Sequence, residues 1–135
     1  MSKLLYVDSS VLLTFALAQP GWETVAETLG QAQDDGYTLA SSRLLWIEAA
    51  RVAIRERFRG NDIEDVLTKN LEAVEQLPVT EEIWIRAAVI EQHIKTLDAI
   101  HLATCETSGA TLATVGLDGG MRKVAAERGV PLLAA

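Results

Sequence analysis

Short apolar runs alternate along this chain with longer segments whose apolar residues recur at helical spacing. The runs that predict strands lie at residues 4–7, 37–40, 78–79, 111–115 and 130–133. The segments that predict helices lie at about 10–18, 22–34, 43–59, 62–77, 81–94, 96–107 and 119–128. Strands that alternate with helices pair in parallel. The sequence therefore predicts an α/β fold, a three-layer α/β/α sandwich with a mostly parallel central sheet of about five strands, formed by a single domain over residues 1–135.

Four acidic residues, Asp8, Glu48, Asp98 and Asp118, lie in or beside apolar segments, where a carboxylate is normally unfavourable. Asp8 and Asp118 each follow a predicted strand, whereas Glu48 and Asp98 lie near the starts of predicted helices. The functional crevice of an open parallel sheet lies beyond the C-terminal ends of its strands. We therefore expect the four side chains to converge there and to form a site for divalent metal ions.

Each acid also has a purely structural interpretation. Asp8 could merely cap a helix, and Asp98 could be a first-turn acid favoured by the helix dipole. The second, Glu48, could pair with Arg51 or Arg55, three and seven residues further along its helix. The fourth, Asp118, could be a turn residue before two glycines. The joint pattern, together with the sequence around each acid, favours the metal-site interpretation.

The local sequences around the first three acids are distinctive. They are the stretches at residues 7–12 (VDSSVL), 42–51 (SRLLWIEAAR) and 97–104 (LDAIHLAT). Together they resemble the PIN-domain nucleases, and among these the VapC-type toxins of bacterial toxin–antitoxin pairs. The resemblance extends over nearly the whole chain, and the Asp-Ala-Ile-His-Leu-Ala block is its most specific part. It implies a Mg²⁺- or Mn²⁺-dependent endoribonuclease with Asp8, Glu48 and Asp98 as metal-site acids.

One stretch departs from the pattern of these nucleases. The family usually has a Thr followed two residues later by its fourth acid, whereas here Thr114 is followed by three other residues before Asp118. The spacing from Asp118 onward fits the family again, so a two-residue insertion is the simplest alignment. We therefore expect Asp118 to be the fourth acid, on a longer loop that contains a glycine.

The ligand chemistry agrees with this resemblance. Hard divalent cations take oxygen ligands, so an all-acid cluster without zinc-type Cys or His spacing favours Mg²⁺ or Mn²⁺. One or two such ions would polarise a phosphate and activate a water for hydrolysis of a phosphodiester bond. Ser10 (or its neighbour Ser9) and Thr114 are supporting candidates that could orient a water or a phosphate, although a capping role explains them equally. For His101, three residues after Asp98, the sequence favours a structural hydrogen bond over catalysis.

The charge distribution bears on an RNA partner. The net charge of −7 opposes phosphate binding, but two bound divalent cations would bring it to −7 + 4 = −3. Five of the twelve basic residues fall within residues 43–59. Arg51 and Arg55 share a helix face with Glu48 and are the candidates for contact with RNA phosphates, with solvated helix charge as the plain alternative.

Cysteine use and the N-terminus bear on location. The one cysteine, Cys105, lies in a helix-like apolar stretch and is expected to be a buried, reduced thiol, which suits the cytoplasm. Asp8 interrupts the apolar run that would otherwise imitate a signal peptide. No run of about 20 apolar residues predicts a membrane span. The resemblance adds two expected partners besides RNA, namely a small antitoxin protein that covers the crevice and a second copy in a homodimer.

Three other functions fit parts of the sequence. A phosphatase with an aspartyl nucleophile suits Asp8, but its usual second Asp is replaced by Ser10. A phospho-acceptor receiver would need an acidic pair after the first strand and a Lys after a late strand, and neither is present. A PIN-like interaction protein with weak or no catalysis stays open because of the insertion before Asp118.

Overall fold

A computed structural model describes residues 3–133, and its centre is a sheet of five parallel strands in the order β3-β2-β1-β4-β5. The strands are β1 (Lys3–Tyr6), β2 (Tyr37–Ser42), β3 (Glu75–Leu77), β4 (Thr111–Ala113) and β5 (Leu132–Leu133). The parallel pairing follows from the helices that separate successive strands. The predicted α/β/α fold with a parallel sheet of about five strands is confirmed.

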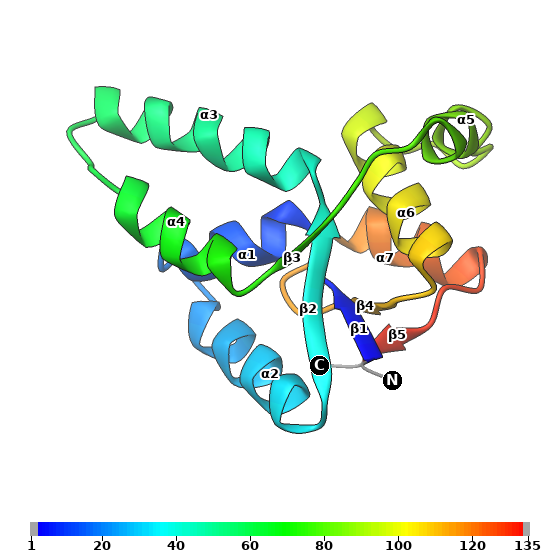
Figure 1. Cartoon of the computed structure of the whole chain (residues 1–135), viewed down its shortest axis with the longest axis horizontal. Coiled ribbons are helices and arrows are strands. Elements are labelled where there is room, and N and C mark those ends of the chain that lie inside the picture. The colour runs from blue at the N-terminus through cyan, green and yellow to red at the C-terminus, as the bar shows by residue number, and fades with distance from the viewer. Residues whose placement is uncertain (1–2, 134–135) are drawn as a thin grey trace.

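Helices cover both faces of this sheet (Figure 1). They are α1 (Ser9–Ala16), α2 (Trp22–Asp34), α3 (Leu44–Phe58), α4 (Glu64–Glu72), α5 (Glu81–Ala88), α6 (Thr96–Ser108) and α7 (Gly119–Glu127). The first four lie on one side of the sheet, where α1 packs against the other three, and α5 to α7 lie on the other side. None of the helices within residues 3–133 is both long enough and apolar enough to cross a membrane.

The second strand is longer than the sequence predicted. Ser41 and Ser42, which lie beyond the strand predicted at residues 37–40, are fully buried and belong to β2, where they pair with β3. The Ser41 hydroxyl donates to the carbonyl of Val7 on β1 at 2.7 Å. Ser42 still serves the helix, because its Oγ accepts a hydrogen bond from the Leu44 N–H at 3.1 Å. Hydroxyls that bond backbone groups let polar residues occupy a buried strand.

Three predicted elements after α3 have wrong boundaries. The helix expected over residues 62–77 ends at Glu72, and the short strand expected at 78–79 lies instead at Glu75–Leu77. The apolar pattern of the predicted helix extended beyond α4 because it included Val74, which packs into the main core although it lies after the helix. Similarly, α5 ends at Ala88, so Ile90 and Ile94 contact the core from a loop rather than from a helix face.

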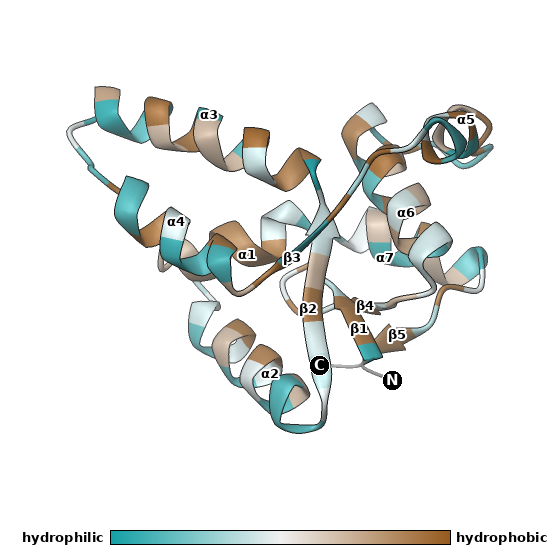
Figure 2. Ribbon diagram, viewed as in Figure 1, coloured by the Kyte–Doolittle hydropathy of each residue, from teal (hydrophilic) through white to brown (hydrophobic). Residues whose placement is uncertain are grey.

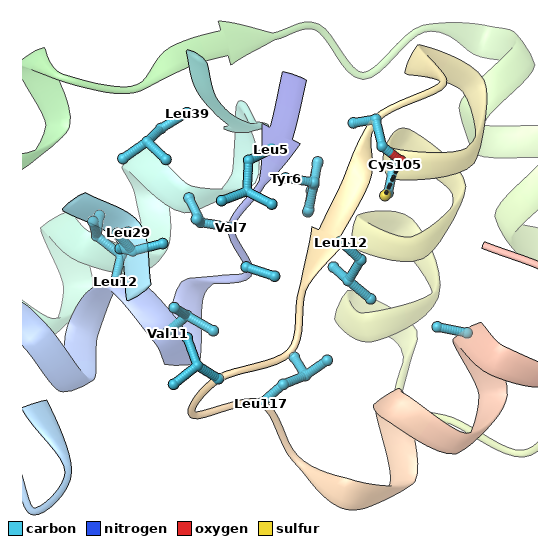
Figure 3. Packing of buried hydrophobic residues seen from close by; sticks show 14 of the residues in the cluster. Leu5, Tyr6, Val7, Val11, Leu12, Leu29, Leu39, Cys105, Leu112 and Leu117 are labelled. Atoms are coloured by element: carbon cyan, nitrogen blue, oxygen red, sulfur yellow. Dashed lines mark hydrogen bonds between the residues drawn. The ribbon is translucent and has the colours of Figure 1, made fainter. Parts of the chain in front are cut away.

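The core surrounds β1, the middle strand (Figure 3). Leu5, Tyr6 and Val7 are fully buried between the helices of the two layers. Tyr6 is in register with Ala40 of β2 on one side and with Leu112 of β4 on the other. The chain leaves the sheet directly after these residues. Asp8 therefore lies at the C-terminal edge of the central strand, where ligand sites of parallel sheets form.

Candidate active site

Asp8 is a buried carboxylate, 5% exposed, at the junction between β1 and α1. It is the N-cap of α1, and its Oδ2 accepts hydrogen bonds from the Ser10 N–H at 3.2 Å and from the Ser10 hydroxyl at 2.7 Å. Its other oxygen, Oδ1, is buried without a hydrogen-bond partner among the described residues. A buried acceptor of this kind is costly unless something compensates it. One side chain therefore caps α1 through Oδ2 and carries a second oxygen, Oδ1, that is without a hydrogen-bond partner among the described residues.

Asp98 lies in the first turn of α6, and the charges of two other acids affect its pKa. Burial raises the pKa of its carboxyl group, and the negative charges of Asp8 and Asp118 raise it further, against the lowering effects of His101 and Lys95. The charges of Asp8 and Asp118 thus act on the Asp98 carboxyl group, as charges that lie near it do. Carboxylates from β1, α6 and the start of α7 thus share one region.

Glu48 projects from α3 and has a hydrogen bond on each oxygen. His101 Nε2 lies 2.7 Å from Oε1, and the Ser9 hydroxyl donates to Oε2 at 3.0 Å. No ion pair joins Glu48 to Arg51 or Arg55 within residues 3–133, so the salt-bridge interpretation does not describe it. The glutamate is instead fixed by groups from two other helices.

His101 is fully buried on α6 and joins Tyr6 to Glu48. Its Nδ1 is 2.6 Å from the Tyr6 hydroxyl, and that hydroxyl also accepts from the Ser42 N–H at 3.0 Å. Burial lowers the pKa of the imidazole, but the hydrogen bond to Glu48 and the charges of Asp8 and Asp98 outweigh it and raise the pKa. The predicted structural hydrogen bond of His101 is present, and it reaches beyond the helical layer.

Sequence reasoning missed Tyr6 as part of this cluster. The signal was available, because Tyr6 and Asp8 are two residues apart and side chains alternate along a strand. The strand face that carries Asp8 therefore also carries Tyr6. Burial raises the pKa of Tyr6 strongly, so its hydroxyl keeps its proton.

Asp118 is exposed and is the N-cap of α7, where its Oδ1 accepts from the Gly120 N–H at 3.1 Å. The preceding loop turns at Gly116, whose φ is +73°. The two extra residues after Thr114 are thus accommodated in a turn before α7. The charge of Asp118 still acts on Asp98.

The supporting candidates occupy different surroundings. Ser10 binds Asp8 directly, as described above. Thr114 is buried, and its hydroxyl donates to the Leu133 carbonyl at 2.6 Å, so it ties β4 to β5. Its own carbonyl accepts from Arg122 Nη2 at 2.7 Å. Of these two hydroxyls, Ser10 lies against an acid and Thr114 is engaged by the backbone.

The basic residues of α3 differ in their availability. Arg57 pairs with Glu64 and Arg59 with Glu56, each at 3.4 Å on the surface. Arg51 and Arg55 are exposed and form no ion pair with any residue from 3 to 133. They leave two guanidinium groups of the Glu48 helix free for an anionic ligand.

The donor set of this cluster fits a hard cation. All four acids can supply oxygen ligands. The Oδ1 of Asp8, which has no hydrogen-bond partner among the described residues, would be stabilised by a bound cation. Over residues 3–133 no three His, Cys, Asp or Glu side chains are already close enough together to enclose a metal ion.

Comparison with known proteins agrees with this architecture. The sequence matches the PIN domain over residues 5–127, and a search of curated proteins found no match. The fold is similar to VapBC2 from Rickettsia felis, solved bound to a DNA fragment from their promoter (TM-score 0.73, 12% identity, 96% of this chain and 97% of that chain).

Two further structures have the same fold. FitAcB from Neisseria gonorrhoeae has a TM-score of 0.64 and 20% identity over 96% of each chain. A toxin–antitoxin complex from Klebsiella pneumoniae has a TM-score of 0.56 and 20% identity, over 84% of this chain and 85% of that chain. At these low sequence identities, the structural similarity shows the fold alone. The match over residues 5–127 identifies the family, and the chain belongs to the PIN domain family.

Proposed function

We propose that this protein is a metal-dependent endoribonuclease and the toxin of a toxin–antitoxin pair. The observation that carries the proposal is the buried, unpartnered Oδ1 of Asp8 in the same region as the Asp98 carboxylate. Carboxylates that lie close together and away from water repel one another, and a bound cation offsets this repulsion. PIN domains are in general nucleases, which supports phosphodiester hydrolysis at this cluster.

Asp8 and Asp98 would hold the divalent cation, Mg²⁺ or Mn²⁺, with Glu48 and Asp118 completing the negative cluster. Such a cation supplies Lewis-acid activation of water and of the scissile phosphate. The chain's own residues prepare the cluster. Ser10 occupies Oδ2 of Asp8 and leaves Oδ1 open, because both of its hydrogen bonds go to the same oxygen.

RNA as the substrate is supported by the cations beside these acids. Arg51 and Arg55 are exposed on the helix that carries Glu48, where they would contact phosphates flanking the scissile bond. Thr114 would act through the strand end that it stabilises, because its hydroxyl already bonds Leu133. The protein would act in the cytoplasm as a single domain.

A partner is supported by apolar side chains that the chain leaves uncovered. Ile47, Ile54 and Phe58 are exposed along α3, with Phe58 at 89%. Figure 2 shows apolar segments spaced along this helix. Trp84 and Val89 are exposed at α5 and its C-cap, at 63% and 68%. We propose that an antitoxin covers α3 and its acids and that α5 forms a homodimer, since exposed apolar patches mark interaction surfaces. A Trp84→Glu variant should then elute as a smaller species in size-exclusion chromatography with light scattering.

The decisive experiment incubates the purified protein with structured RNAs, with Mg²⁺, Mn²⁺ or EDTA. Cleavage should require a divalent cation and should be lost in Asp8→Asn and Asp98→Asn variants. Glu27→Gln, a change at an exposed residue of α2, is the matched control and should retain cleavage. Cleavage that survives EDTA or both active-site substitutions contradicts the proposal. A wild-type protein that binds Mn²⁺ and an antitoxin but cuts no RNA would support the interaction protein instead.

A further inference from the structure

Two hydrogen-bond donors hold Glu48, and the more buried of them belongs to a chain of contacts that crosses the sheet. Starting from the backbone, the Ser42 N–H donates to the Tyr6 hydroxyl at 3.0 Å. The Tyr6 hydroxyl lies 2.6 Å from His101 Nδ1, and His101 Nε2 lies 2.7 Å from Glu48 Oε1. Elements β2, β1, α6 and α3 thus meet through four consecutive groups. The cluster of acids contains only the last of them.

The direction of each hydrogen bond follows from the chemistry of the groups. The Tyr6 oxygen already accepts from a backbone N–H, and a phenol keeps its own proton at neutral pH. In the neutral imidazole, that proton is donated to His101 Nδ1, which is then bare. The ring proton therefore resides on Nε2 and is donated to Glu48. The rings of Tyr6 and His101 also pack edge to face, with centroids 5.9 Å apart.

His101 cannot serve the neighbouring acid in the same way. Its Nδ1 is 3.9 Å from Asp8 Oδ1, beyond hydrogen-bond distance, and this nitrogen is engaged by Tyr6. The histidine is also fully buried, so it has no access to a substrate. Its hydrogen bond to the acids is the one that Nε2–H donates to Glu48.

We propose that His101 is a positioning residue for Glu48, oriented in turn by the Tyr6 hydroxyl. The inference deepens the proposed function, on which it rests, since it assigns the control of one acid to a buried dyad. Ser9 supplies the second contact at Oε2, so Glu48 is held at both oxygens with one rotamer. Groups that orient metal-ligating side chains typically change metal affinity or activity by about 10–100-fold when removed.

The test uses two amide substitutions that differ in reach. In His101→Gln the amide N–H lies near the former position of Nε2 and can still donate to Glu48. In His101→Asn the shorter side chain reaches only the former position of Nδ1. We expect His101→Asn to lower both Mn²⁺ affinity and RNA cleavage by about 10-fold or more and His101→Gln to restore most of both. His93→Gln, a change at an exposed loop histidine, is the matched control.

A double-mutant cycle with Glu48→Gln shows whether the histidine acts through the glutamate. If it does, adding His101→Asn to Glu48→Gln has little further effect on Mn²⁺ affinity or cleavage. Equal losses in His101→Gln and His101→Asn, or fully additive losses in the cycle, would overturn the proposal. Mn²⁺ affinity is measured without RNA, so it stays informative if the wild-type protein cuts no RNA. In that case the proposed function fails and the positioning role is still decided.

A spectroscopic reading is independent of both activity and metal. With His93→Gln as the background, His101 is the only imidazole in the chain, and ¹⁵N-labelled histidine reports its two ring nitrogens by NMR. We expect a protonated Nε2, a bare Nδ1 and a strong shift of the Nε2 signal on Glu48→Gln. An Nε2 signal that ignores Glu48→Gln contradicts the role even if the His101 variants fail to fold.

Discussion

The hydroxyl of Tyr6 lies 2.6 Å from Nδ1 of His101, although 95 residues separate the two in sequence. Both groups are fully buried, so this contact is part of the core as well as of the candidate active site. The same side chains thus contribute to folding and to the placement of an acid, and the two contributions can be measured separately.

Replacing Tyr6 by Phe should destabilise the protein by about 1–3 kcal/mol, because the Ser42 N–H and His101 Nδ1 would be left buried without partners. Urea denaturation followed by circular dichroism measures this free energy of unfolding. Tyr37→Phe is the control, since the Tyr37 hydroxyl makes no hydrogen bond to residues 3–133. Equal stability of the Tyr6→Phe variant and the wild type would mean that the hydroxyl bond contributes nothing net.

Divalent cations should stabilise the folded protein against heat. A ligand that binds only the native state at about 100 times its Kd raises the free energy of unfolding by about 2.7 kcal/mol. The Tm of the wild type should therefore rise with Mn²⁺, whereas that of Asp8→Asn should not. In metal-free buffer Asp8→Asn should be at least as stable as the wild type, because the amide still accepts from Ser10 while one repelling charge is gone. Asp34→Asn, at the end of α2, should behave like the wild type, and a cation-dependent rise retained in Asp8→Asn would argue against this acid as a ligand.

The loop before Asp118 depends on one glycine. Gly116 has a φ of +73°, and a Cβ there would lie 3.2 Å from Val25 Cγ2. Gly116→Ala should cost about 1–2 kcal/mol from the left-handed backbone alone and should lower RNA cleavage by displacing Asp118. Gly30→Ala, in the middle of α2 with open space around its Cα, should instead be neutral or stabilising. Chemical denaturation and the cleavage assay on both variants check these signs.

The single thiol should be unreactive in the native state. Burial raises the pKa of Cys105 to about 12 from the ordinary 9.0, and its Sγ contacts the Ala110 carbonyl at 3.6 Å. An aromatic disulfide reagent at pH 8 should label it only after urea unfolding. Above pH 9 the unfolded chain ionises its thiol while the folded chain does not. Stability should therefore decline as the pH rises from 9 toward about 12, and Cys105→Ala should remove that part of the decline. Rapid labelling without urea would contradict the burial.

The sequence predicted the elements whose patterns are local. The apolar run that ends before Asp8 predicted β1, and the helices predicted at about 22–34 and 96–107 lie within one residue of those bounds. The edge strand β3 was misplaced because Glu75 and Gln76 carry no apolar alternation, and its pairing with β2 decides its position. The contacts of His101 with Tyr6 and Glu48 could not be predicted from periodicity, because they join three elements far apart in sequence.

The central position of β1 has a consequence for how the protein is made. This strand is synthesised first, yet it lies between β2 and β4, and the residues around Asp8 come from as far along the chain as Asp118. A nascent chain that has reached only α5 has β1 paired on one edge and open on the other. The acids from α6 and α7 join Asp8 only after both of these helices have been synthesised. The cluster of acids therefore cannot be complete before the chain has been synthesised as far as Asp118.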